Sequence, residues 1–265
     1  MSAVLDATGI GVSFGGVRAV DGVDLAVGEG QLVGLIGPNG AGKTTFIDAV
    51  TGFVPYRGHV ALDGRDISGL RPHVRARLGL ARTWQSIELF DDLTVRENLV
   101  VASHRPSIRT TLKEVVSRAV VSTDAADRAL ELLGLEDHVE AMPSELSQGQ
   151  RKLVGIARTL AAEPRIVCLD EPAAGLDVGE SAELARRLRQ VVEAGTAMLL
   201  VDHDMGLVLG ISDHVVVLEF GKVIARGAPD TVRRDEKVVA AYLGSAAAET
   251  KQAVEQAARA TTETA

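Results

Sequence analysis

A glycine-rich stretch, Gly37–Thr45, has the residue types and the spacing of a loop that binds phosphate. Its residues are Gly37, Pro38, Asn39, Gly40, Ala41, Gly42, Lys43, Thr44 and Thr45. Glycines let the backbone curl so that successive amides point at phosphate oxygens, and the N-terminus of a following helix adds positive charge. At this spacing, we expect Lys43 to reach the β and γ phosphates of a nucleotide and the Thr44 hydroxyl to hold Mg²⁺.

The residues on either side supply the context that such a loop needs. An apolar run, Leu32–Ile36, precedes it and is typical of a buried strand, while Phe46–Val50 follows as the first turns of a helix. A glycine-rich turn without a ligand is the alternative, and it is disfavoured by this strand and helix. The loop therefore predicts a bound nucleotide, but it does not indicate what the nucleotide's energy drives.

A second stretch, Ile166–Pro172, places two carboxylates at the end of an apolar strand. Ligands bind at the carboxyl ends of strands in parallel sheets. We expect Asp170 to hold Mg²⁺, directly or through water, and Glu171 to orient or deprotonate the water that attacks the γ phosphate. An acidic turn at a strand end is the alternative, and the phosphate loop favours the catalytic interpretation.

A third stretch, Leu146–Gln150, opens a helix that we expect to extend to about Ala162. Ser147 is a good helix cap, and Gly149 allows close backbone approach. On these residues alone, an ordinary helix start is the favoured interpretation. The order of features along the chain favours a functional role instead, because the phosphate loop, a helical block, this helix start and the acidic strand follow one another.

Composition limits the classes of protein to which the chain can belong. Its 265 residues are 46% hydrophobic, which suffices for a large core in one or two domains. The formal net charge of −8 disfavours nucleic acid as the main partner, and a single cysteine, Cys168, excludes a disulfide framework. The sequence shows no signal peptide and no run of about 18 apolar residues, so we expect a soluble, cytoplasmic protein that can still lie against a membrane partner.

The elements that must position these residues alternate between strands and helices. A half-buried strand is predicted at Val23–Val27, and strands at Ile166–Leu169 and Ala197–Val201 are separated by a helix. This alternation predicts an α/β fold with a parallel sheet and helices packed on it. Between the phosphate loop and the acidic strand, helical spacing is found at Thr94–Ser103, Thr111–Val121 and Thr123–Leu133. Thr94 with Glu97 predicts a capping box at the first helix start, and Gly134 predicts the end of the last helix.

These patterns predict one domain over residues 1–244. A helical subdomain is expected as an insert at about residues 86–162, with a loop at Ser103–Arg109. The remaining segment, residues 245–265, is rich in alanine, glutamate and threonine and is expected to be a frayed helix or a disordered tail.

In order and spacing, these stretches resemble those of the ATP-binding cassette (ABC) ATPases over nearly the whole chain. Gln85 lies between the first two stretches, Gly175–Asp177 follows the acidic strand, and His203 follows the next strand. The stretch Leu146–Gln150 corresponds to the signature motif of this family. It departs slightly from the commonest sequence, Leu-Ser-Gly-Gly-Gln, because Gln148 is its third residue. The resemblance implies a P-loop NTPase core, in which a mixed sheet has helices on both faces, with an N-terminal antiparallel β subdomain and the inserted helical subdomain.

The resemblance also implies roles for the matching residues, with ATP and Mg²⁺ as the bound groups. Phe14 stacks on adenine, for which core packing is the alternative, and Val20 packs nearby. Gln85 touches Mg²⁺ and the attacking water, and His203 contacts the γ phosphate. Ser147, Gly149 and Gln150 would contact ATP that is bound to the opposite subunit. Asp177 belongs to the same implied set of nucleotide-binding residues. The implied active unit is a dimer that encloses two ATP molecules.

A finer resemblance is to the ATPases of hydrophobic and branched-chain amino acid importers of the LivG type. The matching segments are Gly79–Gln85, Leu89–Leu99, Val201–Met205 and Ala240–Gly244. In the first of them, Trp84 replaces the family's phenylalanine. Such importers combine two related ATPases, two membrane permeases and a substrate-binding protein, which implies a peripheral position on the inner face of the cell membrane. Trp84 and Phe90 either pack in the core or help residues 84–98 to dock a permease.

Several alternatives stay open or are disfavoured. ATPases of urea and short-chain amide importers are similar, and the transported substrate does not touch this subunit. A soluble ABC ATPase that acts on nucleic acid or ribosomes is disfavoured, because the chain has one cassette and an acidic balance. A non-catalytic cassette is disfavoured by the presence of Glu171 and His203.

Overall fold

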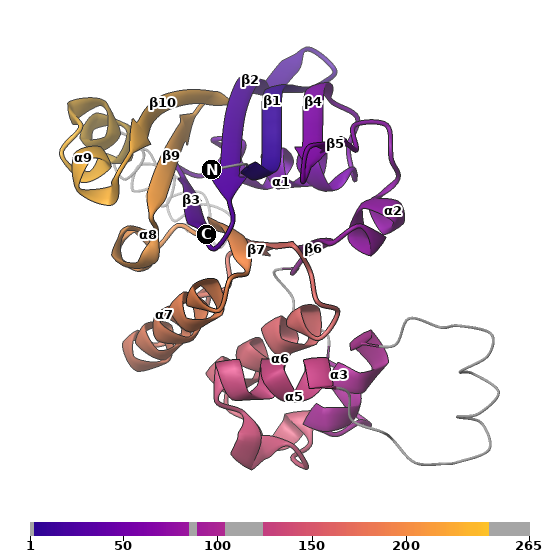
Figure 1. Cartoon of the computed structure of the whole chain (residues 1–265). Coiled ribbons are helices and arrows are strands. Elements are labelled where there is room, and N and C mark those ends of the chain that lie inside the picture. The colour runs from indigo at the N-terminus through magenta and orange to yellow at the C-terminus, as the bar shows by residue number, and fades with distance from the viewer. Residues whose placement is uncertain (1–2, 85–88, 104–123, 244–265) are drawn as a thin grey trace, which may run out of the picture.

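The structure is a computed structural model that describes residues 3–84, 89–103 and 124–243, and it contains two sheets with helices around them (Figure 1). Four antiparallel strands form the first sheet in the order β2-β1-β4-β5. Their bounds are Ala3–Phe14 for β1, Val17–Gly28 for β2, Arg57–Leu62 for β4 and Arg65–Asp66 for β5. The predicted N-terminal antiparallel subdomain is thereby confirmed.

Strands β1 and β2 each span twelve residues. The glycines at 9 and 11 do not end β1; instead, its pairing with β2 shifts register between Ala7 and Ile10. The Gly9 amide donates to the Asp24 carboxylate at 2.6 Å, which satisfies a backbone group that the shift removes from the ladder. The strand expected at Val23–Val27 extends over the whole of β2.

The second sheet has six strands in the order β10-β9-β3-β8-β7-β6. Their bounds are Lys222–Gly227 for β10, His214–Glu219 for β9, Leu32–Ile36 for β3, Ala197–Val201 for β8, Ile166–Asp170 for β7 and Leu80–Arg82 for β6. All neighbours are parallel except β10 and β9. Every residue of β3, β7 and β8 is buried, which explains why these strands are continuous apolar runs apart from Asp170 at the end of β7.

The second sheet separates two hydrophobic cores. In β8, Met198 and Leu200 belong to one core, while Leu199 and Val201 belong to the other, as strand alternation requires. One core contains the antiparallel sheet and α1, and the other contains the remaining large helices. Helix bounds are Lys43–Thr51 for α1, Pro72–Arg77 for α2, Val95–Ser103 for α3, Asp124–Leu133 for α5, Gln148–Leu160 for α6, Val178–Glu193 for α7, Met205–Ile211 for α8 and Pro229–Arg233 for α9, with a further helix over residues 236–243.

Helices α3, α5 and α6 pack together as a helical subdomain between β6 and β7 (Figure 1). The predicted capping box at the start of α3 is present, since the Thr94 amide donates to Glu97 Oε2 at 2.8 Å and the Glu97 amide donates to Thr94 Oγ1 at 3.2 Å. Gly134 follows α5 with a φ of 64° and ends it as predicted.

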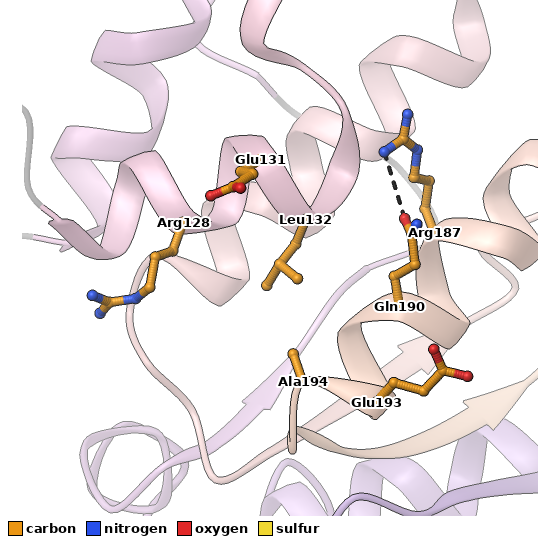
Figure 2. Close-up of a pocket in the computed structure, with 7 residues that line it drawn as sticks. All are labelled: Arg128, Glu131, Leu132, Arg187, Gln190, Glu193 and Ala194. Carbon is orange, nitrogen blue, oxygen red and sulfur yellow. Dashed lines mark hydrogen bonds between the residues drawn. The ribbon is translucent and has the colours of Figure 1, made fainter.

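A groove lies between parts of α5 and α7 (Figure 2). Its lining residues are Arg128, Glu131, Leu132, Arg187, Gln190, Glu193 and Ala194. The helix predicted at Thr111–Val121, most of the predicted loop at Ser103–Arg109 and the predicted tail at 245–265 lie outside the described residues. Among those that are described, no helix has the length and apolar character needed to span a bilayer.

Candidate functional site

The predicted phosphate loop connects β3 to α1 and curls tightly against two other strands. A side chain at Gly37 would collide with the Leu218 carbonyl at the end of β9, and one at Gly42 would collide with the Ala19 carbonyl of β2. Both glycines also have positive φ, 152° and 102°. These close approaches explain the two glycines that frame the loop.

Lys43 begins α1, and its ammonium lies over the loop. Its Nζ donates to the Gly37 carbonyl at 2.8 Å and to the Pro38 carbonyl at 3.1 Å. Burial lowers the pKa of Lys43, while the nearby carboxylates Glu171, Asp170 and Asp202 oppose that shift. The loop thus holds a cation next to the amides that would face a phosphate.

Thr44 and Asp170 meet at the carboxyl end of β7, as the sequence predicts. The Thr44 hydroxyl donates to Asp170 Oδ1 at 3.4 Å, and Asp170 is 2% exposed. Burial raises the pKa of Asp170, and the neighbouring Arg82 guanidinium opposes this shift.

A hydroxyl and a carboxylate are the oxygen donors that Mg²⁺ prefers. Within the described residues, no group of three or more histidine, cysteine, aspartate or glutamate side chains could form a complete metal cage. The pair Thr44 and Asp170 therefore suits Mg²⁺, which is usually held by one or two protein oxygens together with phosphates and water. Gln85, the third predicted metal contact, lies outside the described residues.

Glu171 follows Asp170, and the structure places His203 beside it. The His203 Nδ1 atom lies 3.9 Å from Glu171 Oε2 and 3.4 Å from Asp202 Oδ1. Glu171 has a positive φ of 49° and donates its amide to the Val201 carbonyl at 2.7 Å. This turn directs the chain out of the sheet directly after Asp170, so the two carboxylates occupy different positions at one strand end.

The signature residues occupy the start of α6 and contact α7. Ser147 Oγ donates to Glu180 Oε1 at 3.0 Å, and the Gly149 amide donates to the same oxygen at 2.9 Å. Gln150 completes a capping box with Ser147. Asp177, from the predicted nucleotide-binding set, caps α7 through the Glu180 amide at 2.8 Å. None of these described hydrogen bonds reaches the phosphate loop.

The two residues expected near the adenine lie in different environments. Phe14 ends β1 with 52% of its surface exposed, so its ring is free to accept a stacked base. Val20 is 1% exposed and belongs to the core, and a side chain added at Gly42 would lie 3.4 Å from its Cγ2. Val20 therefore supports the loop from behind.

Four charged residues around this site were missed by the sequence analysis. They are Asp48, Arg82, Lys152 and Asp202. Lys152 lies on the buried face of α6 and donates to the Pro172 carbonyl at 2.7 Å, and the fully buried Asp202 accepts the Ala173 amide at 3.1 Å. For Lys152, a charged side chain at a position where the period of the helix calls for an apolar one was the available signal.

A glycine-rich loop between a parallel strand and a helix, with an acidic strand end beside it, defines a P-loop nucleotide-binding domain. The chain belongs to the ABC transporter family, whose model matches residues 20–174, and it is an ATPase of that family. A second model, described as branched-chain amino acid ATP-binding cassette transporter, matches residues 222–248.

Curated relatives match the chain over nearly its whole length. The chain is 40% identical to BraF of Pseudomonas aeruginosa, a high-affinity branched-chain amino acid transport ATP-binding protein, over 92% of this chain and 98% of that protein. It is 36% identical to LptB of Escherichia coli, a lipopolysaccharide export system ATP-binding protein, over 91% and 98%. A solved ATP-binding cassette in its ADP conformation has a TM-score of 0.79 at 31% identity and covers 92% of this chain and 100% of its own.

Proposed function

We propose that this chain hydrolyses ATP to drive the uptake of branched-chain, hydrophobic amino acids through membrane permeases. In this proposal it works on the inner face of the cell membrane with a second ABC ATPase subunit and, indirectly, a substrate-binding protein. The observation that supports the substrate class is the match of residues 222–248 to the branched-chain amino acid cassette model. The remainder of the fold is common to cassettes that move other substrates.

Export is the competing direction of transport, because LptB is a relative at 36% identity. The identity to BraF is slightly higher, at 40%, and the C-terminal model specifies the importer type. These two findings favour import.

The residues of the chain suggest how hydrolysis proceeds. The loop amides and Lys43 bind the phosphates, and Phe14 stacks on the base. Glu171 orients the attacking water and accepts its proton, and His203, 3.9 Å away, contacts the γ phosphate. Thr44, Asp170 and Gln85 would hold Mg²⁺, which neutralises phosphate charge when bound.

The remaining site residues are proposed to act on a second nucleotide. Ser147, Gly149 and Gln150 would contact ATP held by the loop of another subunit, and Asp177 is proposed to belong to the same nucleotide-binding set. Isolated subunits should then hydrolyse ATP slowly, because half of each site is missing.

Substitution Glu171→Gln tests the catalytic assignment. Since a positioned general base contributes about 10²–10⁴-fold, kcat should fall by roughly that factor while ATP affinity is kept. ATP binding by calorimetry and phosphate release by a coupled assay measure the two effects. Unchanged turnover in this variant would remove Glu171 from the mechanism.

Uptake by cells that lack the gene tests the substrate. Labelled leucine uptake should depend on the unsubstituted chain and should not be restored by Glu171→Gln. Labelled urea and acetamide serve as the competing substrates in the same cells. Restored uptake of either of them without leucine would contradict the branched-chain assignment.

A further inference from the structure

Arg82, the last residue of β6, lies buried between two carboxylates of the candidate site. Its Nη2 donates to Asp170 Oδ2 at 2.9 Å, and its Nη1 contacts Asp48 Oδ1 from α1. The Arg82 side chain is only 6% exposed. One guanidinium thus joins the end of β7 to the helix that follows the phosphate loop.

The two oxygens of Asp170 have different partners. Oδ1 faces the Thr44 hydroxyl at 3.4 Å, on the side where Mg²⁺ is expected, while Oδ2 is bound by Arg82. Arg82 therefore binds the carboxylate from behind and does not occupy the metal side. A planar guanidinium can hold two carboxylates in fixed directions, which an ammonium cannot do with the same geometry.

Two aromatic rings cover the guanidinium. Its Cζ lies 4.3 Å from the centre of the Trp84 ring and 5.9 Å from that of Phe53, and the two rings meet edge to face at 4.9 Å. Within the described part of the chain, the buried Nε of Arg82 has no hydrogen-bond partner. The orientation of the guanidinium is thus set by the carboxylates and the rings, and water is excluded from it.

We infer that Arg82 is a positioning residue for the Mg²⁺ site, which fixes Asp170 so that Oδ1 points at the position shared with Thr44. This inference rests on the proposed function, because it concerns the metal that accompanies ATP. Residues that orient a metal ligand from behind usually change metal affinity about 10–100-fold when they are replaced. If Arg82 acted only as a positive charge, its replacement by a neutral residue would have the opposite effect on metal affinity, because removing a cation from the site would strengthen the binding of Mg²⁺.

The test measures the free Mg²⁺ concentration that gives half of the thermal stabilisation of the protein by AMP-PNP, a non-hydrolysable ATP analogue. Arg82→Met should raise this concentration about 10–100-fold, while stabilisation by AMP-PNP in EDTA stays as in the unsubstituted protein. The EDTA arm separates loss of metal positioning from loss of the folded phosphate loop.

Arg165→Met is the matched control. Arg165 pairs with Asp63 at 2.9 Å and immediately precedes the first residue of β7, at the end of the strand opposite Asp170. The Arg165→Met variant should need the same free Mg²⁺ concentration as the unsubstituted protein. Equal shifts in both variants would attribute the effect to general destabilisation and would overturn the inference.

Arg82→Lys decides the question if Arg82→Met does not fold. It keeps the positive charge but loses the planar fork, so its Mg²⁺ requirement should also rise. An unchanged or lower requirement in either Arg82 variant would overturn the positioning role. Absence of any nucleotide stabilisation in the unsubstituted protein would instead overturn the proposed function, and this inference with it.

Discussion

At the scale of single residues, the side chain of Tyr242, in the helix over residues 236–243, lies beside the phosphate loop. Burial raises the pKa of Tyr242 to about 12, and the nearby Gly37 backbone opposes this shift less strongly. The phenol is therefore kept neutral beside the first glycine of the loop. It belongs to the segment Ala240–Gly244, to which the sequence analysis gave no physical role.

This shift predicts a pH dependence of stability. The ordinary tyrosine pKa of 10.0 applies to the unfolded chain, so that state ionises first as the pH rises. The contribution of Tyr242 to the free energy of unfolding is therefore complete below pH 10. Between about pH 10 and 12, the free energy of unfolding should fall by up to about 3 kcal/mol. Urea unfolding at a series of alkaline pH values measures it. Tyr242→Phe is the control, and equal pH slopes in both proteins would contradict the prediction.

The residues proposed to bind nucleotide could be predicted because their types and order are required by the chemistry. Lys43, Thr44, Asp170 and Glu171 all lie at one end of the parallel sheet, as expected. The residues behind them, such as Arg82, could not be predicted in the same way. A lone arginine in a short strand has many possible partners, and only the strand order places Arg82 next to Asp170.

At the scale of elements, the end of α5 is fitted closely to α7. Gly134 has a φ of 64°, and a side chain there would collide with the Arg187 guanidinium. Arg187 is held by Glu183 Oε1 at 2.6 Å and lies beside Gln190 in the groove of Figure 2. The helical subdomain and the helix after the acidic strand are joined at this point.

Gly134→Ala should therefore be more destabilising than its backbone conformation alone explains. Gly9 is the matched control, because its φ is 63° and a side chain there would meet nothing within 4 Å. We expect about 1–2 kcal/mol for Gly9→Ala and up to roughly 1 kcal/mol more for Gly134→Ala, because the Arg187 guanidinium must leave Glu183 to make room. Chemical denaturation measures both.

A double substitution tests whether the Arg187 side chain causes the additional destabilisation by Gly134→Ala. In an Arg187→Ala background, the cost of Gly134→Ala should fall to that of Gly9→Ala. If the cost stays high without the Arg187 side chain, the collision is not its cause.

Element prediction succeeded where a local signal marks a boundary. The capping pairs at Thr94 and Ser147 mark true helix starts, and Gly134 marks a true end. Helices α8 and α9 were missed because seven and five residues are too short for a clear helical period. The strand predicted to end at Leu169 extends to Asp170, because Asp170 still pairs with Val201 of β8.

At the scale of the whole molecule, the two groups of residues proposed to bind nucleotide lie in separate parts of the chain. The phosphate loop belongs to the sheet domain, whereas Ser147 and Gly149 begin a helix of the helical subdomain (Figure 1). We predict that ATP joins two copies of the chain, with the loop of one facing the signature of the other.

Light scattering after gel filtration tests this arrangement. Glu171→Gln should dimerise in ATP, because the nucleotide persists, and should be monomeric without it. Adding Lys43→Ala to this variant should prevent dimerisation by weakening phosphate binding. A monomer at saturating ATP in Glu171→Gln would contradict the model.

The strand order of the large sheet has a further consequence for synthesis. The antiparallel strands β1, β2, β4 and β5 all fall within residues 3–66, so they can pair early on the growing chain. The central strand β3 must wait, since Leu32 pairs with Met198 and Ile36 pairs with Val217. Although the phosphate loop is made early, it gains its fixed shape only when the chain is nearly complete. ATP can therefore stabilise only a nearly full-length nascent protein.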